Sequence, residues 1–140
     1  MKGAGAMISW VIAAGMALAA CGNEVGTPSG DTIPLGREFT LAVGESALVD
    51  DDVRITLKSV TDDSRCPVDV TCVWEGDAKV SVEVLTPSPR AEHELHTSSR
   101  FDREVRHGAY RITLVRLDPA PRSSAPPSAR DYRATLLVVR

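Results

Sequence analysis

Length and charge place this chain in a narrow range of protein classes. It has 140 residues, with 16 lysines and arginines against 19 aspartates and glutamates, and a formal net charge of −3 at pH 7. After an N-terminal signal is set aside, this length is enough for one domain of ordinary size and not for two. The mild acidic excess gives no reason to expect a nucleic-acid partner, which requires a clustered basic surface.

Residues 1–20 have the features of a secretory signal. Lys2 supplies a basic start, an apolar run follows from about Ala4 to Ala20, and small residues precede Cys21. The run is too short, and too rich in Gly and Ala, for a membrane span of about 20 apolar residues. The last residues before Cys21, Leu-Ala-Ala, resemble the bacterial lipobox, in which signal peptidase II cuts before a lipid-modified cysteine. The resemblance implies a mature lipoprotein that begins at Cys21 and is held in a membrane by acyl chains such as palmitate.

The residue after Cys21 bears on where the protein is located. This residue is Gly22, whereas an aspartate at this position would retain a lipoprotein in the inner membrane. We therefore expect a cell-envelope protein, on the outer membrane and facing the periplasm if the host has two membranes.

Three cysteines limit the covalent possibilities. Lipidation uses Cys21, so only Cys66 and Cys72 remain to pair. Export places them in an oxidising compartment, where a disulfide persists. A metal site at this spacing is the alternative, but zinc prefers four ligands and no second Cys or His pair is near in the sequence. We predict the disulfide.

Beyond the signal, the chain divides into a tether and a β domain. Residues 21–36 contain the lipidated cysteine and a Gly-, Thr-, Pro- and Ser-rich stretch typical of a flexible tether. Residues 37–140 alternate between apolar and polar side chains, which is typical of antiparallel strands with one buried face. Strands are expected within 39–43, 46–49, 53–58, 77–85, 92–97, 101–107, 110–117 and 132–138. This pattern predicts an antiparallel β-sandwich of seven or eight strands.

Several local features qualify these strands. The 92–97 and 101–107 segments are expected to form a hairpin around Ser98-Ser99, and a bulge is expected near Val115-Arg116. The 118–130 segment has four prolines and is long for a loop inside a compact domain. These prolines permit a cis bond, for which Ala125-Pro126 is the favoured site.

Charge is distributed unevenly along the chain. Residues 22–89 contain 5 basic and 13 acidic side chains, whereas residues 90–140 contain 10 basic and 6 acidic ones. A charge dipole that steers a partner would follow if the halves formed different faces. The simpler interpretation is that acidic and basic strands pair across a sheet.

Residues 63–80 are the second most specific stretch. They read D-S-R-C-P-x4-C-V-W-x-G-x-A-x-V, which resembles a signature of small exported bacterial proteins of uncharacterised function, many of them lipoproteins. Residues 108–114 and the Pro-rich loop are also similar, so the resemblance extends over roughly 39–140. It implies export, a disulfide and a β architecture, and it transfers no catalytic or binding residues.

The same motif allows two interpretations from its own residues. Cys72 and Trp74 share a face if a strand begins there, so Trp74 would pack on the disulfide as a core anchor. Gly76 suits a turn or a bulge before the strand expected at 77–85, and Arg65 would clamp the loop through Asp62 or Asp63. The alternative is a ligand site at Arg65 and an exposed Trp74.

The sequence contains few candidate residues for metal binding, catalysis or anion binding. Glu92, Glu94 and His96 share a strand face and would hold a divalent metal with His107 from the next strand, although a solvated polar face explains them as well. The serines lie in no Gly-x-Ser-x-Gly turn and no free thiol remains, so we expect neither an enzyme nor a cofactor. The basic stretch formed by Arg100, Arg103, Arg106 and Arg111 suits anionic envelope polymers or lipid head groups, with surface solvation as the default.

The leading functional hypothesis is therefore a non-enzymatic envelope module that binds a protein or a polymer. We expect contacts on the 121–129 and 66–72 loops if they lie at the same end. The expected contact residues are Arg65, Trp74, Pro121, Arg122, Pro126 and Pro127. The alternatives are a sandwich that binds a metal or an anionic ligand, and a protease inhibitor with a rigid exposed loop.

Overall fold

Eight β-strands make up the part of the chain that the computed structural model describes, residues 31–87 and 89–140. The predicted signal, Cys21 and most of the predicted tether lie outside these residues. Within them there is no α-helix, and accordingly no helix that could span a membrane. The strands are β1 (Glu38–Ala42), β2 (Ser46–Val49), β3 (Val53–Thr61), β4 (Lys79–Leu85), β5 (Ala91–His96), β6 (Glu104–His107), β7 (Tyr110–Asp118) and β8 (Arg133–Val139).

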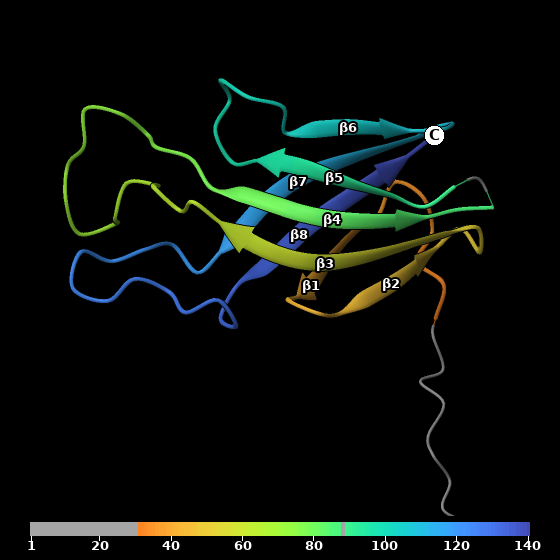
Figure 1. Ribbon diagram of the computed structural model, residues 1–140, viewed down its shortest axis with the longest axis horizontal. Helices are drawn as coiled ribbons and strands as arrows, with labels where there is room; N and C mark the ends of the chain where they lie inside the picture. The colour runs from red at the N-terminus through yellow and green to blue at the C-terminus, as the bar shows by residue number, and fades with distance from the viewer. Residues whose placement is uncertain (1–30, 88) are drawn as a thin grey trace, which may run out of the picture.

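The strands form two antiparallel sheets of four, ordered β1-β8-β7-β6 and β2-β3-β4-β5. Figure 1 shows the second sheet in front of the first, with the strands of the two sheets crossing at an angle. The buried side chains of both sheets form a single cluster, so the two sheets share one core. The predicted β-sandwich is confirmed.

Period-two alternation accounts for the core. In β3, Val53, Ile55 and Leu57 are fully buried, and in β4 the three valines at 80, 82 and 84 are buried in the same way. The other sheet supplies inward-facing residues such as Ile112 and Leu136. Each strand therefore presents one apolar face to the opposite sheet. The bulge expected near Val115-Arg116 is present, because the β7–β8 register shifts between Leu114 and Arg116.

The predicted hairpin around Ser98-Ser99 is wrong. Strand β5 pairs with β4, whereas β6 pairs with β7 in the other sheet. The physical cause lies in Asp77, whose Oδ1 accepts the backbone N–H groups of Thr97 (3.0 Å) and Ser98 (2.9 Å). These bonds hold the chain where it leaves β5, and it then crosses from one sheet to the other.

Two further expectations are corrected. The folded part begins before residue 37, because Ile33 pairs with Val49 and both Ile33 and Leu35 pack against the core. The cis peptide is Asp118-Pro119 and not Ala125-Pro126.

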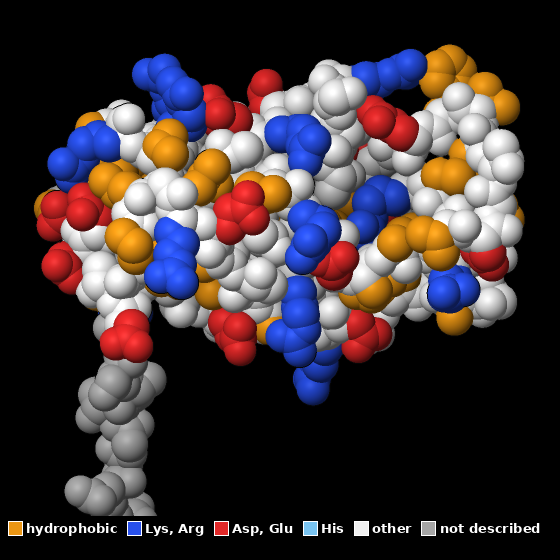
Figure 2. Space-filling model, turned by 180° about the vertical axis from the view of Figure 1, so that it is seen from behind, with side chains coloured by type: hydrophobic (Ala, Val, Ile, Leu, Met, Phe, Trp, Pro, Cys, Tyr) orange, Lys and Arg blue, Asp and Glu red, His pale blue; other side chains and the backbone are white. Residues whose placement is uncertain are grey.

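Charged side chains are mixed on the outer face of the β1-β8-β7-β6 sheet, where Figure 2 shows basic and acidic groups interspersed. Ion pairs also join the acidic and basic halves of the chain: Arg140 lies 3.3 Å from Asp50, and Arg90 lies 3.7 Å from Glu83. These pairs favour the simpler interpretation of the uneven charge, in which the two halves pair with each other.

Candidate functional site

Three loops gather at one end of the sandwich, which we call the loop end. They are the β3–β4 loop (62–78), the β5–β6 loop (97–103) and the β7–β8 loop (119–132). In Figure 1 they lie on the left, whereas the orange start of the described chain and the C-terminus lie on the right. The 66–72 and 121–129 segments, expected to act together only if they shared an end, do share it.

The disulfide is formed as predicted. Cys66 and Cys72 are bonded, with their Cα atoms 5.9 Å apart, and the short ring they close reaches the β7–β8 loop. The backbone N–H of Val68 donates to the Pro121 carbonyl (3.0 Å). The Asp69 carboxylate accepts the backbone N–H (2.9 Å) and the hydroxyl (2.6 Å) of Ser123. These Ser123 hydrogen bonds lower the pKa of Asp69. The two loops are therefore one connected unit.

Arg65 is the clamp that holds this unit to the sandwich. Its Nε donates to Asp63 Oδ1 (2.8 Å), and its two terminal nitrogens donate to the carbonyls of Leu117 (2.7 Å) and Pro119 (2.8 Å). A planar guanidinium matches a carboxylate and two carbonyls at once. The predicted clamp through Asp63 is confirmed. Its guanidinium is engaged internally, so the interpretation of Arg65 as a ligand contact is not supported.

The Asp63 carboxylate also accepts the Tyr132 hydroxyl (2.8 Å). Burial raises the pKa of Asp63, but hydrogen bonds from Arg65 and Tyr132 outweigh it and the net pKa is lowered. Burial, together with the hydrogen bond to Asp63, raises the pKa of Tyr132 to about 12. The carboxylate therefore stays ionised and the phenol stays protonated, which maintains the bond between them near neutral pH.

Gly76 sets the path of the β3–β4 loop. Its φ is +70°, and a Cβ placed there would lie 1.8 Å from the Ser64 carbonyl oxygen. The two arms of the loop are paired there by Ser64 N–H to the Asp77 carbonyl (2.7 Å) and Cys66 N–H to the Glu75 carbonyl (2.9 Å). Only glycine combines this φ with this approach. Gly76 therefore has the left-handed backbone conformation that the expected turn or bulge would use.

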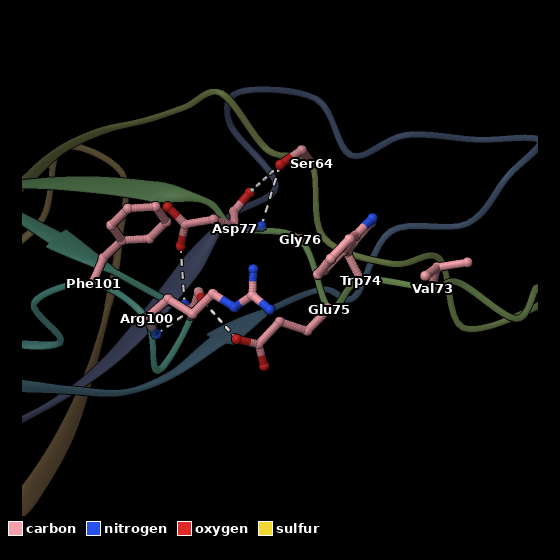
Figure 3. Close-up of a pocket in the computed structure, with 9 residues that line it drawn as sticks. Ser64, Val73, Trp74, Glu75, Gly76, Asp77, Arg100 and Phe101 are labelled. Atoms are coloured by element: carbon pink, nitrogen blue, oxygen red, sulfur yellow. Dashed lines mark hydrogen bonds between the residues drawn. The ribbon is translucent and has the colours of Figure 1, made fainter.

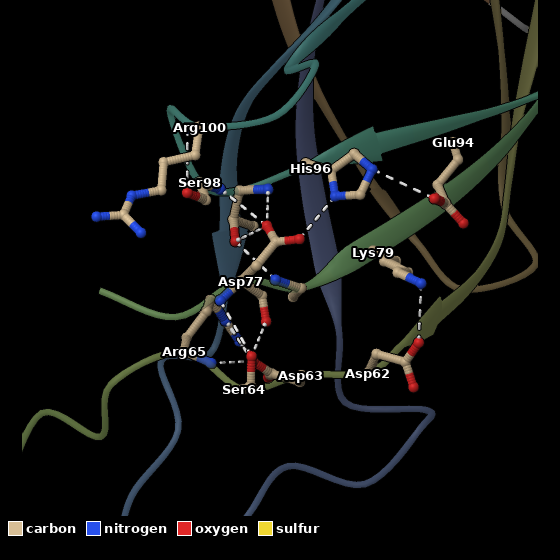
Figure 4. Close-up of polar contacts among 12 residues, drawn as sticks. Asp62, Asp63, Ser64, Arg65, Asp77, Lys79, Glu94, His96, Ser98 and Arg100 are labelled. Atoms are coloured by element: carbon tan, nitrogen blue, oxygen red, sulfur yellow. Dashed lines mark hydrogen bonds and ion pairs between the residues drawn. The ribbon is translucent and has the colours of Figure 1, made fainter. Parts of the chain in front are cut away.

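Asp77 joins the β3–β4 loop to the β5–β6 loop (Figure 4). Besides Thr97 and Ser98, its carboxylate contacts His96 Nδ1 at 2.6 Å. Burial raises the pKa of Asp77, yet the hydrogen bonds from His96 and Ser98 lower it overall. Next to it, Glu75 accepts the hydroxyls of Ser98 and Ser99, and the Ser98 bond is the main cause of its lowered pKa.

Trp74 is 65% exposed, so its predicted role as a core anchor on the disulfide is wrong. No strand begins at Cys72, since β4 starts at Lys79 and the preceding residues follow the turn that Gly76 sets. The exposed ring is covered in part by Arg100, whose guanidinium carbon lies 4.8 Å from the ring centroid. Such an arrangement is a cation–π contact.

A groove of about 430 Å³, which we call the Trp74 groove, lies between the β3–β4 and β5–β6 loops. Figure 3 shows Val73 and Trp74 projecting from one loop, and Arg100 and Phe101 from the other. The Phe101 ring packs against His96, with centroids 5.0 Å apart. The lining residues are Ser64, Val73, Trp74, Glu75, Gly76, Asp77, Ser98, Arg100 and Phe101. An open, partly apolar groove with one guanidinium is suited to binding.

The four expected metal ligands are not brought together as one set. Glu92 accepts the Ser81 hydroxyl, while Glu94 lies 3.2 Å from His96 Nε2. His107 is buried and faces inward, where its Nδ1 lies 3.1 Å from His93 Nε2. Because His107 lies on the other side of β5 from Glu92 and Glu94, it cannot complete their set. Across the described residues, no group of three or more His, Cys, Asp or Glu side chains is arranged to hold a metal.

The other expected contact residues differ in exposure. Pro121 is buried, whereas Arg122 and Pro126 are exposed and Pro127 is half-buried. The basic stretch does not form one surface. Arg103 donates to the carbonyls of Leu114 (3.2 Å) and Val115 (2.9 Å), Arg111 lies 3.1 Å from Glu104, and Arg106 is exposed.

Val73 and Phe101 are groove residues that were not predicted from the sequence, and neither was the contact between Arg100 and Trp74. Val73 and Phe101 are 90% and 56% exposed. The signal for Val73 was its place in a loop tied by a disulfide and a glycine turn, which interrupts the strand pattern. No local signal identified Phe101.

Comparison with protein-family models, with curated proteins and with solved structures finds no match to this chain.

Proposed function

We propose that this protein is a lipid-anchored module of the bacterial cell envelope that binds another macromolecule through its loop end. Cys21 is the proposed point of lipidation and the outer membrane the proposed location in a host with two membranes. The chain acts in this proposal as a binding component and not as an enzyme.

One observation carries the proposal. The large apolar side chains exposed on the described surface are Val68, Val70, Val73, Trp74, Leu85 and Phe101, and all except Leu85 lie in the loops of the loop end. Apolar side chains exposed in this way lower the solubility of a protein, and a cluster of them commonly marks a binding site.

The rigidity of the loops supports the same proposal. A disulfide, the Arg65 clamp and the Asp69–Ser123 contacts fix the β3–β4 and β7–β8 loops to each other. Asp77 fixes the β5–β6 loop to them. Loops that are ordered before binding lose less conformational entropy when they meet a partner. The apolar surface is therefore presented in one arrangement.

Site-specific photo-crosslinking in the native host tests the proposal. A photoreactive amino acid is placed at Val73, on the loop end, and separately at Leu85, which ends β4 at the opposite end of the sandwich. We expect a defined protein or polymer adduct from position 73 that is absent from position 85. The adduct should also be lost in Trp74→Ala, which removes an exposed side chain. Equal adducts from both positions, or none at position 73, would contradict the proposal.

The anchor is tested separately. Cys21→Ser should abolish incorporation of a palmitate analogue and release the protein from the membrane fraction. Retention of the label in this variant would exclude Cys21 as the lipidated residue. Neither result depends on the loop end.

A further inference from the structure

We infer that the Trp74 groove binds an extended peptide segment of a partner protein in which a carboxylate side chain stands beside a large apolar side chain. This inference rests on the proposed function and specifies the chemistry of the partner. It follows from three features of the groove: an unengaged guanidinium, apolar walls, and acidic groups that are already hydrogen-bonded.

The guanidinium of Arg100 is the group that selects a carboxylate. Its contact is the Trp74 ring, and within residues 31–87 and 89–140 it forms no hydrogen bond or ion pair. It affects Glu75 through charge, as a minor cause of the lowered pKa of that residue. Arginine carries five N–H donors in a planar fork that fits a carboxylate. Stacking on the indole holds this fork at the groove while its donors remain free.

Two carboxylates line the same groove, and both are engaged. Asp77 accepts hydrogen bonds from Thr97 and Ser98 and contacts His96. Glu75 accepts the hydroxyls of Ser98 and Ser99. Three of their four oxygens already accept hydrogen bonds or contact His96, so the free hydrogen-bonding capacity of the groove is mainly that of the Arg100 donors. A ligand must therefore supply an acceptor, and a carboxylate forms the strongest such bond to arginine.

The walls indicate a peptide and not a polysaccharide. Val73, Trp74 and Phe101 present apolar surface next to the guanidinium. A polysaccharide would need several side chains that accept bonds from its many hydroxyls, whereas Asp77 and Oε1 of Glu75 already accept hydrogen bonds from the protein. Trp and Arg are also the residue types that dominate protein–protein binding energy. An acidic residue next to Leu, Ile or Phe would place its carboxylate on Arg100 and its apolar group on Trp74.

Peptide selection on the full-length protein tests the inference. A phage-displayed library of random peptides is selected against wild type, and the enriched peptides are measured against variants by isothermal titration calorimetry. We expect Asp or Glu next to a large apolar residue, with affinity reduced roughly tenfold or more in Arg100→Gln. The matched control is Arg106→Gln, since Arg106 is also exposed and should leave affinity unchanged. Glu75→Gln removes a repelling charge and should strengthen binding.

Any result of the peptide selection other than the expected one would overturn the inference. Enriched peptides without carboxylates, peptides insensitive to Arg100→Gln, or weaker binding in Glu75→Gln would each show that the groove does not select a carboxylate. Failure to enrich any peptide, together with Arg100-dependent binding of polygalacturonate, would identify an acidic polysaccharide instead. Failure to enrich any peptide, with no polygalacturonate binding, would also reject the peptide. The crosslink from position 73 separates these failures from failure of the proposed function, because it detects any partner at the loop end.

Discussion

Replacing Gly76 by alanine is the sharpest test of how the site is built. At φ +70° the left-handed conformation alone costs a non-glycine residue about 1–2 kcal/mol. The added Cβ would also lie 1.8 Å from the Ser64 carbonyl oxygen and 2.8 Å from the Arg65 Cα. These are backbone atoms, which cannot move aside as a side chain can. The two arms of the β3–β4 loop must separate.

The cost of that separation follows from the bonds that join the arms. Ser64 N–H to Asp77 O and Cys66 N–H to Glu75 O are both lost, and each contributes about 1 kcal/mol net. We therefore expect Gly76→Ala to lower the free energy of unfolding by about 3–4 kcal/mol. Since Trp74 stands on this turn, the Trp74 groove should also be distorted.

Urea denaturation measures the effect, with Gly108→Ala as the matched control. Gly108 also has positive φ, +59°, but no atom lies within 4 Å of its hypothetical Cβ. This variant should lose only the conformational contribution of about 1–2 kcal/mol. If both variants were destabilised equally, the close approach of Gly76 to Ser64 would have no energetic role and the reasoning would be refuted.

Three further predictions concern the clamp, the histidine pair and the disulfide. Arg65→Lys should lower the free energy of unfolding by about 2–3 kcal/mol, because lysine cannot contact Asp63 and two carbonyls together; no change in urea denaturation would mean that the clamp is dispensable. Burial, and to a lesser extent the charge of His107, lower the pKa of His93 below 6.5. The unfolded chain thus binds the proton more readily, so the stability from this residue is complete above about pH 6.5 and is lost as pH falls through the folded-state value; a His93→Gln variant with an equally steep pH dependence would contradict this. Removing the disulfide by a double Cys→Ser change should cost about 2.4 kcal/mol on the chain-entropy model of a short loop, and an unchanged denaturation midpoint would show that the hydrogen bonds between the loops are sufficient.

The sandwich was predictable because burial on one face leaves a signal within a single strand. In β3 the alternation of Val53, Ile55 and Leu57 with polar residues is enough to assign the strand and its inward face. The disulfide was predictable for a different reason. Only two cysteines remained after the proposed lipidation, so no information about distant contacts was needed.

The position of Trp74 was not predictable in the same way. The period-two argument holds only if residues 72–74 belong to a strand, and the backbone there follows the approach of Gly76 to Ser64. That approach joins residues twelve positions apart in the sequence and leaves no local pattern. The prediction of a hairpin between β5 and β6 failed for a similar reason. The group that holds the connection between these strands is Asp77, about twenty positions before Thr97.

The candidate site depends both on a pattern within one segment of the sequence and on contacts between distant segments. The motif at 63–80 identified Trp74 and Arg65 as special, and the structure separates their roles into an exposed surface and an internal clamp. The partner of Trp74 in the groove, Arg100, comes from a segment that no sequence pattern linked to it. Residues that meet only through loop packing are therefore the part of such a site that requires a structure.

The proposed lipid anchor bears on how the loop end is placed relative to the membrane. The described chain enters the sandwich at the end opposite the loops (Figure 1). Cys21 precedes residue 31 by ten positions, which span at most about 35 Å even when fully extended. A lipid at Cys21 thus keeps the entry end near the membrane and leaves the loop end free to face away from it. The Trp74 groove is then best placed for a partner that approaches from the aqueous side, and an exposed Trp74 in that position does not compete with the membrane for the same apolar surface.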